Sequence, residues 1–313
     1  MYTGIALLIL ISLAPIVILL WYFDHLDKEK ESRKFLWVIF LWGVFATAIA
    51  GGIEFVLDTF LIDIFYFPLI QLFVVAFIFT AVTEEALKYW VVKRKAYDHP
   101  AFNEYFDGII YAVTASLGFA ALENVLYVLD GGLYVGVIRA LMAVPAHALF
   151  GVMMGYYIGL ARFEKNPEKE KKLLGKGLFL AILFHGIYDF LLLSGTLYSI
   201  FVIPMLLGMF LNARRKIKHL HVLDKVKGAQ MPKPFTKWNY IKTGVGMIFF
   251  TIGVLMLLTV LLFITGDPIG EELFQEIEFD VYGSSLFVGI FWLIAYAFIR
   301  EKKSKKKDKV KYI

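Results

Sequence analysis

Long apolar segments alternate with short charged segments along almost the whole chain. The apolar runs cover approximately residues 2–22, 36–57, 65–92, 106–129, 134–161, 177–193, 196–212, 241–265 and 282–299. Most runs are close to the ~20 residues that an α-helix needs to cross a hydrocarbon core. Inside lipid, only a helix or a closed barrel satisfies every backbone polar group. The pattern therefore predicts an all-α fold, a polytopic membrane helix bundle with about nine transmembrane helices.

The charged residues between the apolar runs predict the orientation of the chain. Basic residues cluster in the segments that begin near residues 28, 93, 162 and 214 and in the tail after residue 301, whereas the segment 266–280 is acidic. Cytoplasmic loops carry the excess of Lys and Arg. We therefore expect the N-terminus outside, the C-terminus in the cytoplasm and a multi-pass protein of the cell membrane. No basic segment precedes the first run, which favours a retained anchor over a cleaved signal peptide.

The same pattern predicts one membrane-embedded domain over residues 1–313. Within it, residues 65–212 form the core helices that carry the candidate site, and residues 213–240 form a cytoplasmic basic loop. Residues 241–313 form two C-terminal spans and a basic tail. We find no internal repeat of the kind that marks a duplicated transporter.

Composition narrows the possible chemistry. The chain is 59% hydrophobic and 19% charged, against about half and about a quarter in soluble domains. Its net charge of +5 lies in short loops between apolar runs, so we expect the lipid bilayer and no nucleic acid as a partner.

The chain has no Cys, which excludes disulfides, thiolate metal sites and a cysteine nucleophile. Catalysis would have to use carboxylates, histidines, hydroxyls or a metal with O and N ligands. The oligomeric state is left open.

Two adjacent carboxylates, Glu84 and Glu85, lie inside an apolar run. Each costs about 3 kcal/mol or more in a membrane helix unless it faces a polar interior. Such a pair is a candidate functional site. The alternative is a structural salt bridge, because Lys88 lies four and three residues after the two glutamates.

His147 lies on a face of small residues. The pattern repeats every four residues through Ala143, His147, Gly151, Gly155 and Gly159. Small residues at this spacing let membrane helices pack closely, so the histidine is predicted to face the bundle. The alternative is a packing histidine that is bonded to a neighbouring carbonyl.

His185 and Asp189 are four residues apart and therefore share one helix face. The carboxylate can accept a hydrogen bond from one ring nitrogen and fix the tautomer of the other. Metal ligands and catalytic bases both use this arrangement. A structural polar pair is the alternative.

The distance of each group from the cytoplasmic end of its helix indicates whether these groups can meet. Glu85 lies roughly 10 Å above Val92 and His185 roughly 14 Å above Lys176, which predicts that the site lies in the cytoplasmic half. Glu123, followed by Asn124, fits less well at roughly 24 Å from Asp107. We expect either a later start of that helix or an outer network in which Glu123 pairs with Arg139.

Together these residues resemble the PrsW family of intramembrane proteases, which is grouped with CAAX prenyl endopeptidases and Abi proteins. The likeness spans about residues 65–212 and consists of Glu84-Glu85-x-x-Lys88, Glu123-Asn124, His147 and His185-x-x-x-Asp189. It implies an endopeptidase whose substrate is a membrane protein, such as a single-span anti-sigma factor. The wider group often has Arg and Asn where this chain has Lys88 and Asp189.

The resemblance also implies site roles, in two versions. The catalytic residues are Glu84, Glu85, His147, His185 and Asp189, and the supporting residues are Lys88, Glu123 and Asn124. In the first version no metal takes part and one of the two glutamates is the general base. In the second version Zn²⁺ is held by His147, His185 and Glu85.

Two other functions remain open on the sequence alone. The same superfamily includes a non-catalytic membrane scaffold, and Glu and His chains in membranes also relay protons in transporters. If the site is catalytic, we expect Glu85→Gln to abolish activity and to leave the melting temperature unchanged or higher, because like-charge repulsion is relieved.

Overall fold

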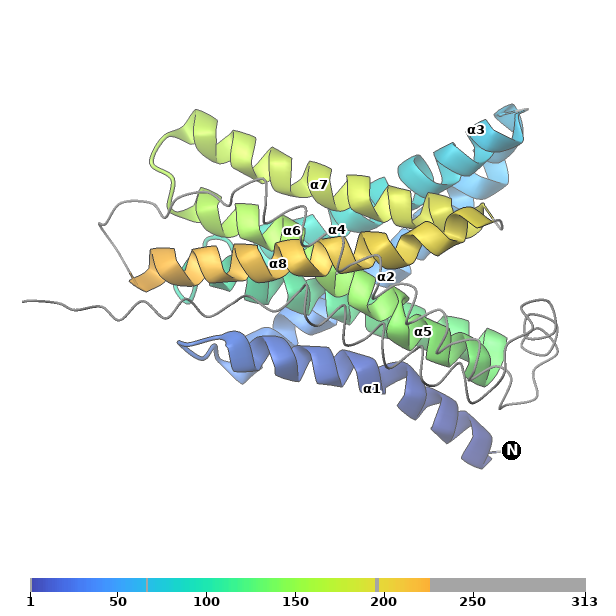
Figure 1. Cartoon of the computed structure of the whole chain (residues 1–313), viewed down its shortest axis with the longest axis horizontal. Helices are drawn as coiled ribbons and strands as arrows, with labels where there is room; N and C mark the ends of the chain where they lie inside the picture. The colour runs from blue at the N-terminus through green and yellow to red at the C-terminus, as the bar shows by residue number, and fades with distance from the viewer. Residues whose placement is uncertain (1, 66, 195–196, 226–313) are drawn as a thin grey trace, which may run out of the picture. The chain divides into compact units, whose positions relative to one another are not determined.

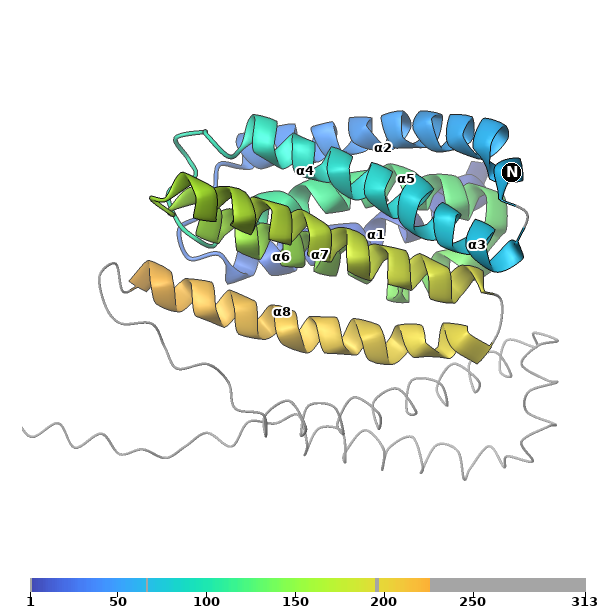
Figure 2. The same cartoon turned by 90° about the horizontal axis from the view of Figure 1, so that it is seen from above.

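The computed structural model describes residues 2–65, 67–194 and 197–225, and these residues contain helices and no strand. Eight α-helices follow one another: α1 (Tyr2–Leu26), α2 (Arg33–Leu61), α3 (Pro68–Phe73), α4 (Thr83–Lys95), α5 (Asp107–Leu141), α6 (Ala143–Arg162), α7 (Pro167–Leu193) and α8 (Val202–Lys225). The long helices lie side by side along one axis (Figure 1, Figure 2). The all-α prediction is confirmed. The predicted spans 241–265 and 282–299 lie outside the described residues.

Among the described residues, five segments are long and apolar enough to cross a membrane: Leu8–Leu26, Arg33–Leu61, Pro68–Lys95, Asp107–Arg162 and Pro167–Leu193. They overlap the first six predicted spans, because the fourth of these segments holds two of them. Helix α8 is not among the five. It covers most of the predicted span 196–212 and then stays helical to Lys225, so the first part of the predicted loop 213–240 is helix.

The chain reverses direction at Gly132, inside the helical run of α5. Gly132 has φ 73° and ψ −161°, a left-handed backbone that favours glycine. Beyond it, Arg139 reaches back to Glu123 and Asn124, which a straight helix would place roughly 23 Å away. The predicted break between the runs 106–129 and 134–161 is therefore confirmed. A second bend, at Met142 (φ −120°, ψ −63°), leads into α6.

Helix α6 packs with its backbone directly against that of α5. A Cβ atom added to Gly155 would lie 2.3 Å from the carbonyl oxygen of Gly108, and one added to Gly159 would lie 2.1 Å from that of Tyr105. Only glycine permits this approach. The predicted small-residue face is thereby confirmed. It places His147, one turn before Gly151, inside the bundle with 4% of its surface exposed.

A π-helix over Val74–Val82 joins α3 to α4 and ends just before Glu84. π-Helical turns are rare and often occur at functional sites. This one packs against α7, where Phe77 lies over Gly186: a Cβ atom added to Gly186 would be 2.3 Å from the phenylalanine ring. The close contact brings α4 and His185 together.

Candidate active site

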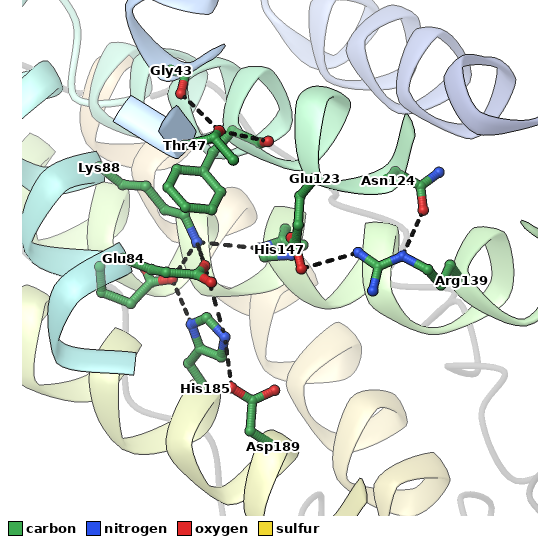
Figure 3. Close-up of polar contacts among 12 residues, drawn as sticks. Gly43, Thr47, Glu84, Lys88, Glu123, Asn124, Arg139, His147, His185 and Asp189 are labelled. Carbon is green, nitrogen blue, oxygen red and sulfur yellow. Dashed lines mark hydrogen bonds and ion pairs between the residues drawn. The ribbon is translucent and has the colours of Figure 1, made fainter. Parts of the chain in front are cut away.

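The polar residues predicted from three separate apolar runs meet in the centre of the bundle (Figure 3). Glu84 and Glu85 come from α4, His147 from α6 and His185 from α7. Each of the four has 5% or less of its surface exposed. The prediction that these groups converge is confirmed.

Lys88 lies between the two glutamates and His147. Its Nζ atom is 2.8 Å from Glu84 Oε2, 2.8 Å from Glu85 Oε1 and 3.1 Å from His147 Nδ1. The ammonium group also lies 4.2 Å from the centre of the Phe119 ring. The salt bridge that we considered as an alternative therefore exists, and it is part of the site.

The contacts of His147 define its tautomer. An ammonium group can only donate, so Nδ1 of His147 accepts from Lys88. The proton then lies on Nε2, which is 2.8 Å from Glu123 Oε2. His147 is thus held as a neutral imidazole whose Nδ1 lone pair faces the Lys88 ammonium group.

His185 has a different environment, because carboxylate oxygens face both of its ring nitrogens. Nδ1 is 2.9 Å from Glu85 Oε1, and Nε2 is 3.2 Å from Asp189 Oδ2 and 3.9 Å from Glu84 Oε2. Only a doubly protonated ring donates on both sides. Its ring stacks on Phe150 at 4.8 Å. The predicted pairing of His185 with Asp189 is confirmed.

Glu123 belongs to the site as well as to an outer network. It binds His147, and its Oε1 atom is 3.1 Å from Arg139 Nη2. Asn124 accepts from Arg139 Nε at 2.8 Å and donates to the carbonyl of Ser12 at 2.7 Å. The outer network therefore connects α1 and α5 to the histidine of α6.

A cavity of about 490 Å³ adjoins these residues. Its polar lining consists largely of Glu54, Glu84, Glu123, Arg139, His147, His185 and Asp189. Glu85 is not part of the lining and has no exposed surface. The two adjacent glutamates thus differ: one carboxylate faces the cavity, and the other lies behind it.

Glu54, on α2, is an acidic residue of the cavity that was not predicted from the sequence. It is a single acidic residue in the run 36–57, with no motif around it. The available signal was the cost of a carboxylate within a membrane-spanning run, which marks it as a site candidate by itself.

The helix bounds add to the depth estimate without testing it. His185 is eight residues from the end of α7 at Leu193 and eighteen from its start at Pro167. His147 is four residues from the start of α6. Both histidines therefore lie nearer the helix ends that the charge pattern predicts to be external. The depth of the site in the membrane stays a prediction. The predicted start of the sixth helix at residue 177 is wrong, because α7 begins ten residues earlier.

The residues that could hold a metal differ from the predicted set. Donor atoms of Glu84, Glu85 and His147 lie within 4.8 Å of one another. His185 contacts Glu85 but is not in this group. Two carboxylate oxygens and one imidazole nitrogen are a donor set that suits Zn²⁺. The ammonium group of Lys88 contacts the same three residues, so a metal ion there would have to displace it.

Comparison with known proteins finds one matching family and several relatives that share the name of that family. A family model described as "PrsW family intramembrane metalloprotease" matches residues 31–212. A protein named Protease PrsW from Geobacillus kaustophilus is 38% identical over 212 residues, or 67% of this chain and 91% of the relative. Proteins of the same name from Halalkalibacterium halodurans and Oceanobacillus iheyensis are 36% and 32% identical, over 68% and 66% of this chain and 97% and 93% of their own. No solved structure matches the chain.

Proposed function

The chain belongs to the PrsW family of intramembrane metalloproteases, and from this premise we propose that it hydrolyses a peptide bond of a membrane protein in the cavity beside Glu84, His147 and His185. The family and the names of the relatives indicate that the chain is a protease. This assignment replaces the scaffold and transporter functions that the sequence alone left open. The substrate, the catalytic groups and the metal are the parts that we propose here.

We assign the role of general base to Glu84. Hydrolysis needs a water molecule activated by a group within hydrogen-bond reach, and Glu84 lines the cavity where water and substrate can meet. Glu85 is fully buried and binds Lys88 and His185. Its role in this proposal is to hold those two cations in place.

We assign charge stabilisation to His185. The ring is oriented by Asp189 and Glu85, and it lines the cavity. A fixed positive charge beside the position where an oxyanion develops lowers the barrier by a few kcal/mol. Asp189 then acts as a positioning residue, because its contact with Nε2 holds the charged ring in place.

The charge of the site favours a bound divalent cation. Five carboxyl groups line or adjoin the cavity, from Glu54, Glu84, Glu85, Glu123 and Asp189, against the positive charges of Lys88, Arg139 and the doubly protonated His185. Glu84, Glu85 and His147 would each hold the ion through one atom, which would leave the second carboxylate oxygen of Glu84 free to act as the base. When bound, Zn²⁺ would supply a Lewis acid for the scissile carbonyl. The ammonium group of Lys88 would have to leave the three donors.

Exposed apolar residues in the lining of the cavity favour a substrate that lies in the membrane. Four of the residues that line the cavity are large, apolar and exposed: Leu126, Tyr127, Leu192 and Leu193. Exposed apolar groups at the edge of a polar cavity fit a substrate that arrives from lipid. A single-span protein such as an anti-sigma factor has this form. The relation to CAAX prenyl endopeptidases remains a prediction.

The charge pattern completes the proposal. With the N-terminus outside and the basic loops in the cytoplasm of a cell-membrane protein, His147 and His185 lie toward the external ends of α6 and α7. Cleavage is then expected near the external edge of the substrate span.

The observation that carries this proposal is the placement of Glu84 and both histidines in the lining of one cavity. The test compares new protein N-termini in membranes of cells that carry the wild type or Glu84→Gln. We expect termini near the edge of a single-span protein with the wild type only. Equal sets of termini, with both proteins folded and present, would contradict the proposal.

A further inference from the structure

The wall of the cavity formed by α2 has no part in the chemistry assigned above. Four residues line the cavity from this helix: Thr47, Ala50, Gly51 and Glu54. Their spacing of three and four residues puts them on one helix face. Reacting groups such as Glu84 and His147 lie on other walls of the same cavity. The α2 face is therefore positioned to contact a molecule bound beside those groups.

Glu54 has an unused hydrogen-bond acceptor on this wall. Its Oε1 atom is buried, and among the described residues none donates a hydrogen bond to it. Glu84, by contrast, binds Lys88. Glu123 Oε2 and Asp189 Oδ2 also accept no hydrogen bond, but each lies within 3.2 Å of a histidine nitrogen. A buried carboxylate oxygen without a donor is costly. A ligand that brings an N–H group to Glu54 would remove that cost.

Gly51, one turn before Glu54, leaves open space beside this acceptor. A Cβ atom added to Gly51 would meet nothing within 4 Å. Gly43, on the same helix, is different, because its Cβ atom would lie 2.2 Å from the carbonyl oxygen of Ala115. Gly43 is therefore required for helix packing and Gly51 is not. Glycine at position 51 keeps room for a backbone that lies close to the helix.

We propose that the α2 face at Gly51 and Glu54 binds the substrate polypeptide. The substrate backbone lies over Gly51 and donates an N–H group to Glu54 Oε1, beside the bond that is cut. Within a regular helix almost every N–H group is already paired. The site therefore selects a stretch of substrate that is extended or unwound. This inference rests on the proposed peptidase function.

The first test uses two neighbouring glycines. Gly52, like Gly51, has nothing within 4 Å of an added Cβ atom, but it does not line the cavity. The purified full chain is assayed on the single-span protein whose cleavage depends on Glu84. We expect Gly51→Leu to raise KM about tenfold, and Gly52→Leu to stay within about twofold of the wild type. Wild-type KM for Gly51→Leu, or an equal loss in both variants, would overturn the proposal.

The second test removes the acceptor. We expect Glu54→Leu to raise KM about tenfold with kcat within about threefold, and Glu54→Gln, which keeps a carbonyl oxygen, to stay within about threefold in both. Asp58→Asn, on an exposed position one turn further along α2, is the matched control. Because Glu54 Oε1 has no hydrogen-bond partner to lose among the described residues, Glu54→Leu should melt no lower than the wild type.

The outcomes separate this inference from the proposed function. Cleavage by the wild type and none by Glu84→Gln, together with normal KM values for Gly51→Leu and Glu54→Leu, would remove only the role of α2. If the wild type cuts no single-span protein at all, the peptidase proposal fails and this inference fails with it.

Discussion

The two ends of α6 show opposite ways of using a membrane helix. At one end, Gly155 and Gly159 press against the backbone of α5 and leave no room for a methyl group. We call this contact the α5–α6 seam. At the other end, His147 lies at a cavity among carboxylates and a lysine. The seam gives the helix a fixed position, and the cavity uses that position. Packing and chemistry are thus separated along one helix, so substitutions at its two ends should have different effects.

The largest expected effect is on catalysis, at the cavity end. We expect Glu84→Gln and Glu85→Gln each to reduce cleavage by a factor of about a thousand. They should differ in stability. Glu85 is fully buried and binds both Lys88 and His185, and loss of one partner from a buried ion pair costs about 3–5 kcal/mol.

This prediction replaces the expectation from the sequence that Glu85→Gln leaves the melting temperature unchanged or higher. Lys88 already lies between the two carboxylates, so there is little repulsion to relieve. Thermal unfolding of both variants measures the difference. If Glu85→Gln melts with or above the wild type, the assignment of a holding role to Glu85 is wrong.

The next largest effect is on the seam. We expect Gly155→Ala to destabilise the protein by about 3 kcal/mol, because the new methyl group would lie 2.3 Å from the Gly108 carbonyl oxygen. Gly175→Ala on α7 is the control, since a Cβ atom there meets nothing within 4 Å. Both changes favour helix formation. Equal melting temperatures for the two variants would show that the seam does not hold α6.

A third prediction concerns the metal. We expect purified protein to contain about one Zn²⁺ per chain, and we expect His147→Ala to lose most of it. Lys88→Met should bind the metal about tenfold more tightly, because a competing ammonium group is removed. Metal analysis and titration with Zn²⁺ measure both effects. Undiminished metal in His147→Ala, or full cleavage after chelation, would contradict the assigned ligands.

The smallest effect tests a carboxyl group outside the cavity. Asp27 is 4% exposed, and its Oδ1 atom has no partner among the described residues. Burial, followed by the charge of Glu31, raises the pKa of Asp27 from 3.8 to about 6. The folded state therefore binds this proton more tightly than the unfolded state. The resulting stabilisation is complete below pH 3.8 and is lost as the pH rises through about 6.

We therefore expect Asp27→Asn to be more stable than the wild type by about 1–2 kcal/mol near pH 7.5, since solvent screens part of the charge. The gain should shrink as the pH falls from about 6 to about 4. Melting curves across this range provide the measurement. A gain that does not change with pH would mean that Asp27 is not destabilised by its charge.

Most residues of the site could be predicted from the sequence, but their detailed arrangement could not. Carboxylates and histidines inside apolar runs stand out because lipid excludes them, and the glycine pattern correctly placed His147 inside the bundle. The face of Glu84 could not be read from helical periodicity, because the π-helix over Val74–Val82 changes the register just before it. Glu54 was missed because it belongs to no motif.

The start of α7 differs from the prediction for a reason that the sequence does contain. The charged segment after Arg162 was taken as a loop, but α7 already begins there at Pro167. The side chain of Asn166 accepts hydrogen bonds from the backbone N–H groups of Glu168 and Lys169. Asn followed by Pro at the first helical position is a recognised helix start.

The most direct test of the account is cleavage in a purified system. The full chain and the single-span protein identified by its Glu84-dependent terminus are placed together in lipid vesicles. We predict that the wild type cuts the same bond as in cells, and that Glu84→Gln, shown to be folded by its cooperative melting, leaves the substrate intact. An intact substrate with folded wild type, or equal cleavage by Glu84→Gln, would contradict the claim that this cavity carries out the proteolysis.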